Sequence, residues 1–515
     1  MAAFIASPLS AASRQWGARI AWVGRSPGSE YRTLLAAGPL VAGIVGGMAL
    51  NLGPVTSVAA IGAILAAVAS PAVGLATLAF MAPLKPPPAI PAPGFNTVLV
   101  GAILLGCIYR LPIDRPRLRV SAPLLVLLAF ILYVAVQQLP DMLMGWTGEE
   151  GHLVGFQFVQ LLTGFGAVLA AGYVLSNRSP YSVLAMAMAG AALAATIALV
   201  MFRGTFGPFV NLTVQSTDGT RALGPFGNPN YLGVFIAIGI AAAVGLQVGV
   251  RTRLARIVLI GTAMLLAGAL AVSLSRGALV AAATGLAVLA LSLSRRLGVL
   301  VIVLGAFAAV VVYPAFIQWR LISETGSASA AAYAATALSD SGRLTAVLAA
   351  PLIFLSSPIT GVGFGHYAQM SVQVGGALSP IDAHNWYLNV LAEEGTVGIA
   401  LWMLLLITLV VALSTRPPAA RALGYAVLAA LAAGSLFLEP PTSFQTMAVP
   451  AILLVAALVS DWALQPEVQI DPILTIRLAF ERGPRTPSRR SSGSRWRPAS
   501  GPGSQSPQSP SRGAD

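Results

Sequence analysis

Long apolar segments separated by short polar ones run through the chain from residue 33 to residue 464. A helix needs roughly 17 to 25 mostly apolar residues to cross a bilayer. Only 9% of the residues are charged, against about 25% in a soluble domain. We therefore predict an all-α polytopic membrane protein of about 12–14 transmembrane helices. The predicted spans are 33–50, 55–69, 71–84, 95–110, 121–140, 154–176, 182–202, 231–249, 257–274, 278–294, 297–316, 396–414, 422–438 and 446–464.

The uncertainty in this number comes from the second and third spans. Both are short, and Ser70–Pro71 divides them. They could therefore form a re-entrant pair instead of two full spans, which lowers the count to 12.

The net charge of +13 raises the question of a nucleic-acid partner. Most of this excess lies at the two ends of the chain, in residues 1–32 and 477–515, which leaves the membrane body close to neutral. A body without a continuous basic face does not fit a duplex or a single strand, so we expect no nucleic acid. The single cysteine, Cys107, lies in an apolar run, which excludes disulfides and argues against thiolate metal sites.

Basic residues also predict the orientation, because Lys and Arg accumulate in short cytoplasmic loops. With the N-terminus inside, 24 of the 30 Lys and Arg residues fall on the inner side. We therefore place the protein in the cytoplasmic membrane as a multi-pass protein with both termini cytoplasmic.

Three regions follow from this reading. They are a basic cytoplasmic leader at 1–32, a membrane domain at 33–464 with a large outer loop at 317–395, and a cytoplasmic tail at 465–515. From about residue 482 the tail is rich in Ser, Pro, Gly and Arg. Such a composition cannot bury a core, so this part is predicted to be disordered.

The polar motifs gather on the predicted outer side. Arg221 precedes a Gly/Pro/Asn-rich turn, Arg276 lies at a turn between two spans, and Arg343 lies in the large outer loop. Arg presents planar, permanently charged donors that suit phosphate, and no DxD-like carboxylate cluster accompanies these three. We expect them to bind a diphosphate leaving group without a metal or other cofactor. For Arg276, snorkelling at a helix end is a competing explanation.

The segment DAHNWYLNVLAEEG at 382–395 carries the candidate catalytic residue. We predict a short helix over 383–394 with Asp382 as N-cap and Gly395 as C-cap. His384 in its first turn would be kept neutral by the helix dipole, as a general base must be. Asn385 and Tyr387 could orient a polar substrate beside it. Loop packing is the alternative role for His384.

Two other features have simpler explanations. Gly361, Gly363 and Gly365 could form an anion-binding nest, but a tight turn is the favoured interpretation. His152 and His366 are expected to be ordinary histidines of the outer loops.

Five motifs together resemble the O-antigen ligase and O-antigen polymerase (Wzy) superfamily. They are RALGPFGNPN at 221–230, SRGA at 275–278, SGR at 341–343, PITGVGFGH at 358–366 and HNWYLNVLAEEGTVG at 384–398. The motif region, about 221–398, follows the order of the family. The first 200 residues resemble it only in being a series of spans.

The resemblance implies a GT-C-like membrane glycosyltransferase of cell-surface polysaccharide assembly, with its site on the outer face. Such enzymes transfer a glycan from undecaprenyl diphosphate to a hydroxyl acceptor, which is a lipid, a glycan or a protein. In this sequence the resemblance makes His384 the base and Arg221 and Arg343 the diphosphate ligands, with Arg276 as a third. The resemblance does not distinguish a ligase from a polymerase. A lipid or sugar transporter is the alternative from another class, although the spans carry almost no charged residues for a path.

Overall fold

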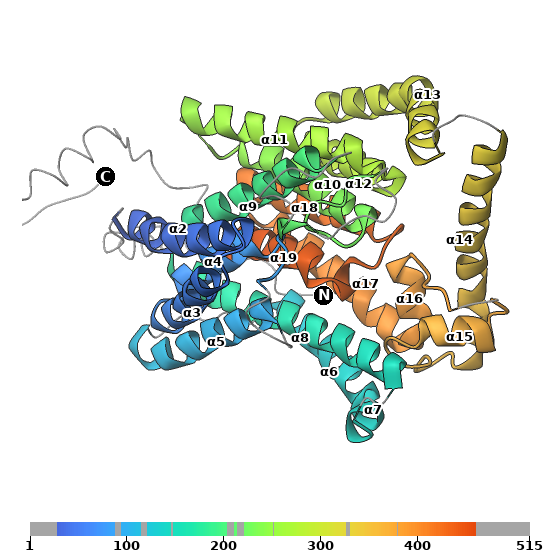
Figure 1. Ribbon diagram of the computed structural model, residues 1–515, viewed down its shortest axis with the longest axis horizontal. Helices are drawn as coiled ribbons and strands as arrows, with labels where there is room; N and C mark the ends of the chain where they lie inside the picture. Colours follow the sequence, from blue (N-terminus) through green and yellow to red (C-terminus); the bar gives the residue numbers. More distant parts are fainter. Residues whose placement is uncertain are drawn as a thin grey trace, which may run out of the picture. The chain divides into compact units, whose positions relative to one another are not determined.

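The protein is described here by a computed structural model (Figure 1). The chain divides into Met1–Gln465 and Pro466–Asp515, and only the first unit is discussed, because the predicted tail lies outside the described residues. So does the leader up to residue 27. The structure describes residues 28–87, 94–114, 121–145, 148–202, 211–213, 221–250, 252–325, 330–377 and 380–459.

Every predicted span coincides with a helix, and the described residues contain no strand. The all-α polytopic fold is therefore confirmed. These helices are α2 (Gly28–Ala49), α3 (Gly53–Ala69), α4 (Pro71–Met81), α5 (Phe95–Asp114), α6 (Ala122–Gln137), α8 (Gly148–Asn177), α9 (Tyr181–Val200), α10 (Pro229–Leu246), α11 (Arg253–Ser273), α12 (Arg276–Leu293), α13 (Arg295–Thr325), α17 (Gly395–Ser414), α18 (Pro418–Gly434) and α19 (Phe444–Val459).

The number of full spans stays a prediction. Among the described residues, eight helices are long and apolar enough to cross a membrane, and six apolar helices are shorter. The predicted division at Ser70 is present: its backbone is extended and separates α3 from α4.

The remaining elements lie in the loops. They are α7 (Leu139–Leu143), α14 (Ala330–Ser356), α15 (Tyr367–Gln373), α16 (Trp386–Glu393) and the 3-10 helix η2 (Pro440–Thr442). The outer loop predicted at 317–395 therefore contains short helices, as expected. It also contains a long one, α14, and the end of α13, which continues beyond its predicted limit of 316 to Thr325.

The centre of the helical bundle is made by α10, α12 and α18, which pack against one another, and by α19, which packs on α10 and α18. Small residues let these helices approach closely, as is usual in membranes. At Gly285 of α12, an added Cβ would lie 2.9 Å from the Cβ of Ala430 in α18. By contrast, α11 and α17 leave most of their apolar surface uncovered, as expected for helices that face lipid.

Contacts at the helix ends follow the predicted two-sided topology. At one end, Gln445 donates to the carbonyl oxygen of Leu84 at 3.0 Å, and both residues are predicted to be outside. At the other end, Arg110 donates to the carbonyl oxygen of Ala69 at 2.6 Å. The N–H of Ser182 donates to Glu30 at 3.0 Å. These four residues are all predicted to be inside.

Candidate active site

The backbone around His384 differs from the predicted helix. Helix α16 begins at Trp386, and its N-cap is Asn385, whose Oδ1 accepts from the N–H of Leu388 at 3.1 Å. The short helix predicted over 383–394 is therefore present, but it begins three residues later than predicted, and Asp382 is not its N-cap. His384 lies before the cap in a left-handed conformation, with φ of 49°, which is uncommon for a residue other than glycine. Gly395 does lie after the end of α16, with φ of 65°.

His384 is half-buried, and its pKa is lowered from the ordinary value. Burial is the largest cause and the positive charge of Arg343 the second, while Asp382 acts in the opposite direction. The direction agrees with the predicted neutral imidazole. The predicted cause was wrong, because His384 is not in the first turn of a helix.

The loop between α18 and η2, residues 435–439, holds the His384 segment in place. The N–H of Trp386 donates to the carbonyl oxygens of Ser435 and Leu438, at 2.8 and 3.2 Å. The Trp386 side chain is fully buried and packs edge-on against Trp402 of α17, with ring centroids 5.4 Å apart. The position of His384 therefore depends on the 435–439 loop and on α17.

Glu439 adds a second attachment from the same loop. Its carboxylate is held by the backbone N–H groups of His384 and Asn385. Burial raises the pKa of Glu439 to about 8, and the negative charges of Asp382 and Glu393 contribute in the same direction. Glu439 therefore keeps its proton to a higher pH than an ordinary glutamate does.

Arg343 reaches the same region from α14. The neighbouring residue, Gly342, lies against Ile381, whose Cδ1 is 3.8 Å from where a Cβ of residue 342 would be. Helix α14 also packs on α16. The effect of Arg343 on the pKa of His384 shows that the two side chains are electrostatically coupled.

Arg221 lies at the turn between α11 and α12. Its Nε donates to the carbonyl oxygen of Ser273 at 3.0 Å, and its Nη2 donates to Oδ1 of Asn230 at 2.9 Å. Arg276 begins α12 at the same turn. An added Cβ at the next residue, Gly277, would lie 2.6 Å from the Cβ of Phe437. This turn therefore packs against the 435–439 loop that supports His384.

Tyr231 connects the Arg221 segment with η2. It follows Asn230, the partner of Arg221, and its side chain is hydrogen-bonded with Thr442 of η2. The charges of Glu439 and Asp382 act on it as well. The structure thus brings the segments of Arg221, Arg276 and His384 to residues 435–442, while Arg343 acts on His384 from α14, which packs on α16.

Asn385 and Tyr387, predicted to orient a substrate, both have structural partners. Oδ1 of Asn385 caps α16, as described above. The Tyr387 hydroxyl donates to the carbonyl oxygen of Ala432 in α18 at 3.0 Å. Substrate orientation by these two residues stays a prediction. Asn385 also fixes the start of α16, and Tyr387 also attaches α16 to α18.

The glycine-rich segment 361–365 packs on the carboxyl group of Glu393, at the end of α16. Gly361, Gly363 and Gly365 all have positive φ. The N–H groups of Gly365 and Tyr367 point to the Glu393 carboxylate, and that of Tyr367 is 2.8 Å from its Oε1. The segment is therefore a tight turn on the end of α16, in agreement with the favoured interpretation.

Sequence reasoning missed the buried carboxyls of this site. Glu393 and Glu439 are 2% and 5% exposed, and Glu394 is completely buried. Burial raises the pKa of Glu393 to about 8. Burial also raises the pKa of Glu394 well above the ordinary value, with the charge of Glu393 as a second cause. Acidic residues at the ends of apolar segments were the available signal, since such residues are costly to hold near lipid.

Among the described residues, no three His, Cys, Asp or Glu side chains are grouped as metal ligands would be. The independence of the chemistry from metal nevertheless stays a prediction.

The helices and the loops between them define a polytopic membrane protein with a polar site at one end of its bundle. Residues 261–403 match the family model described as O-Antigen ligase, so this part of the chain is similar to the O-antigen ligase family. Arg276, Arg343 and His384 lie within the matched residues, whereas Arg221 precedes them. A search of curated proteins finds no match. The family match supports a membrane enzyme of surface polysaccharide assembly.

Proposed function

We propose that the protein is a glycosyltransferase that moves a glycan from undecaprenyl diphosphate to a hydroxyl acceptor on the outer face of the cytoplasmic membrane. The observation that carries the proposal is the half-buried His384 beside Arg343, within the residues that match the O-antigen ligase family. A neutral imidazole can act as a base, and the guanidinium next to it can bind an anion.

In the proposed reaction, a ring nitrogen of His384 takes the proton from the acceptor hydroxyl. The acceptor oxygen then forms a bond to the anomeric carbon of the glycan. The bond from that carbon to the diphosphate oxygen breaks, and the diphosphate leaves with the electron pair. Attack from the opposite side inverts the configuration at this carbon.

The arginines stabilise the negative charge that develops on the diphosphate. Arg343 serves this role from α14, and Arg221 from the segment before α10, which packs on the end of α11, with Arg276 as a third ligand. The bonds to Ser273 and Asn230 already fix two N–H groups of Arg221. The guanidinium group is therefore oriented before the substrate binds. This preorganisation reduces the entropy lost on binding.

The assignment of the base is tested by His384→Ala in the full-length protein. The expected result is loss of transfer at wild-type insertion and protein level. His152→Ala, which removes an exposed histidine at the start of α8, is the matched control and should retain activity. Normal transfer by His384→Ala would contradict the assignment.

The reaction class is tested by reconstitution in liposomes with an undecaprenyl-diphosphate-linked glycan, candidate acceptors and a chelator. Transfer to a different acceptor identifies a ligase, and a longer glycan on the same lipid identifies a polymerase. Movement of the donor across the bilayer without covalent change would favour a transporter. Activity that returns only with added metal would refute the metal-independent mechanism.

A further inference from the structure

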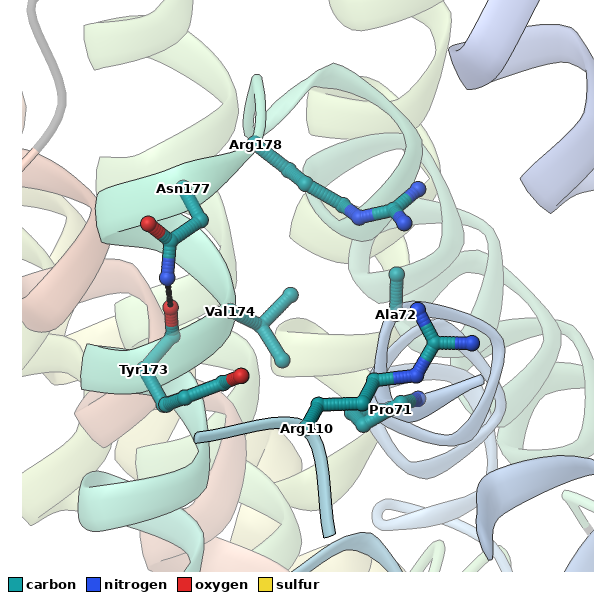
Figure 2. A pocket seen from close by; sticks show the side chains of 7 residues that line it. All are labelled: Pro71, Ala72, Arg110, Tyr173, Val174, Asn177 and Arg178. Carbon is teal, nitrogen blue, oxygen red and sulfur yellow. Dashed lines mark hydrogen bonds between the residues drawn. The ribbon is translucent and has the colours of Figure 1, made fainter. Parts of the chain in front are cut away.

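A shallow cleft with two arginines lies at the end of the bundle away from His384. It is lined by Pro71, Ala72, Arg110, Tyr173, Val174, Asn177 and Arg178, and its enclosed part is small, about 10 Å³, so most of the cleft is open (Figure 2). Helix α4 shows the separation of the two sites. It begins in this cleft, and the chain that continues it reaches Leu84, which contacts Gln445 at the opposite end.

Both guanidinium groups extend toward Ala72 at the start of α4 (Figure 2). Arg110 is anchored there by its bond of 2.6 Å to the carbonyl oxygen of Ala69, the last residue of α3. Within the described part of the chain, no carboxylate forms an ion pair with Arg110 or Arg178. Two like charges that share a cleft repel each other, and a bound anion would remove this repulsion.

The polar groups beside the two arginines are bonded in a way that reduces their repulsion of an anion. The carbonyl oxygen of Tyr173, near the C-terminal end of α8, would repel a negative ligand. It is occupied by Nδ2 of Asn177 at 2.8 Å and by the hydroxyl of Ser176 at 3.0 Å. The partial negative charge of this helix end is thereby reduced where the arginines converge.

The surroundings of the cleft suit a lipid. Pro71, Ala72 and Val174 form an apolar floor. In the turn of α5 before Arg110, Ile108 and Tyr109 are 62% and 71% exposed, as expected for side chains that contact acyl chains or the headgroup region. The cleft also lies at the end of the bundle predicted to be cytoplasmic, where anionic lipids attract basic residues.

We propose that this cleft binds the phosphate group of an anionic phospholipid, which Arg110 and Arg178 hold between them. Because the cleft is shallow, the headgroup lies across it and the acyl chains remain in the bilayer. The ligand links α4, α5 and α8, which pack together at this point. The inference is independent of the proposed glycosyl transfer.

The test uses the full-length protein, delipidated in a neutral detergent, with phosphatidylglycerol as the probe. Thermal unfolding and native mass spectrometry give the stabilisation and the number of lipids bound. We expect one tightly bound phosphatidylglycerol and a rise in Tm for the wild type. Arg110→Gln/Arg178→Gln should lose the bound lipid, with affinity reduced about 10-fold or more for each guanidinium removed.

Arg253→Gln/Arg256→Gln is the matched control, because it removes two charges from the same predicted face, on α11. It should bind lipid as the wild type does. An equal response of the two double variants would overturn the proposal. If the Arg110 and Arg178 double variant does not accumulate, each single variant must show weaker binding than the corresponding single variant of the control pair.

Two further experiments distinguish a lipid headgroup from a free phosphate ion as the ligand. Phosphatidylcholine, whose headgroup has no net charge, should bind more weakly than phosphatidylglycerol. Inorganic phosphate or glycerol phosphate at equal concentration should not compete with phosphatidylglycerol. Competition by either would overturn the lipid assignment in favour of a free phosphate ligand.

Discussion

In the proposed mechanism, the neighbours of His384 make it a suitable base, and its own position in a helix does not. Burial and the charge of Arg343 lower its pKa, and Asp382 offsets part of this effect. The imidazole therefore stays neutral at pH values where an ordinary histidine, with a pKa near 6.5, becomes charged. In the proposed mechanism this extends activity toward acidic pH.

This electrostatic coupling predicts how Arg343→Gln changes the pH profile. Removing the guanidinium raises the pKa of His384, so the acidic limb of kcat/KM against pH should move to higher pH. The variant should also be slower at every pH, because it loses a diphosphate ligand. Arg421→Gln, at the start of α18, is expected to leave the profile in place. A slower Arg343→Gln enzyme with an unmoved limb would disprove the coupling.

Arg221→Lys should reduce transfer by about 10- to 100-fold. A lysine cannot bond Ser273 and Asn230 and still present a second pair of donors to a diphosphate, and each charge-assisted bond contributes about 1.5–3 kcal/mol. Arg256→Lys is the control, since Nε of Arg256 also donates to a carbonyl oxygen at 3.0 Å, that of Val250. Wild-type kinetics for Arg221→Lys would remove Arg221 from the site.

Among the elements, the contact between Gly395 and the 359–361 turn fixes the angle between α16 and α17. Gly395 has φ of 65°, and a Cβ there would collide with the carbonyl oxygen of Ile359. Gly376 has a similar φ of 73° but open space around it. The two glycines therefore separate the effect of backbone strain from that of a steric clash.

We predict that Gly376→Ala destabilises the protein by about 1–2 kcal/mol, the strain of a left-handed alanine. Gly395→Ala should destabilise it by about 3 kcal/mol or more, because the clash adds to this strain. Thermal unfolding in detergent measures both, and transfer activity should fall with Gly395→Ala. Equal losses of stability would mean that the close packing at Gly395 relaxes without consequence.

The N-cap of α16 could not be predicted from the local sequence. Aspartate and asparagine are both good N-caps, so local pattern favoured Asp382 as readily as Asn385. The choice is made by contacts from 50 residues later, where Ser435 and Leu438 bind the N–H of Trp386. The apolar segments, in contrast, were predicted well, because the bilayer imposes the same requirement on every span.

At the scale of the whole molecule, buried carboxyls make stability depend on pH. In the folded protein the pKa values of Glu393 and Glu439 are about 8, against 4.5 for an ordinary glutamate. The folded state therefore keeps protons that the unfolded state has lost. The stabilisation is complete below pH 4.5 and is lost as the pH rises to about 8.

We expect Tm to fall as the pH increases from about 5 to about 8 and to change little above that. Glu393→Gln/Glu439→Gln should flatten this dependence, because glutamine keeps an acceptor oxygen without ionising. Glu30→Gln, at the other end of the bundle, should leave the curve as it is. Parallel curves for the wild type and the double variant would show that other groups control the dependence.

The bonds from Trp386 to Ser435 and Leu438 also bear on how the enzyme is made. During synthesis the His384 segment leaves the ribosome long before the residues that hold it. A nascent chain that ends before residue 435 would contain His384, Arg221 and Arg343 but not the loop that gives His384 its backbone conformation. Transfer should therefore begin only after α18 and α19 have been inserted. Incomplete chains in the membrane would have no transfer activity.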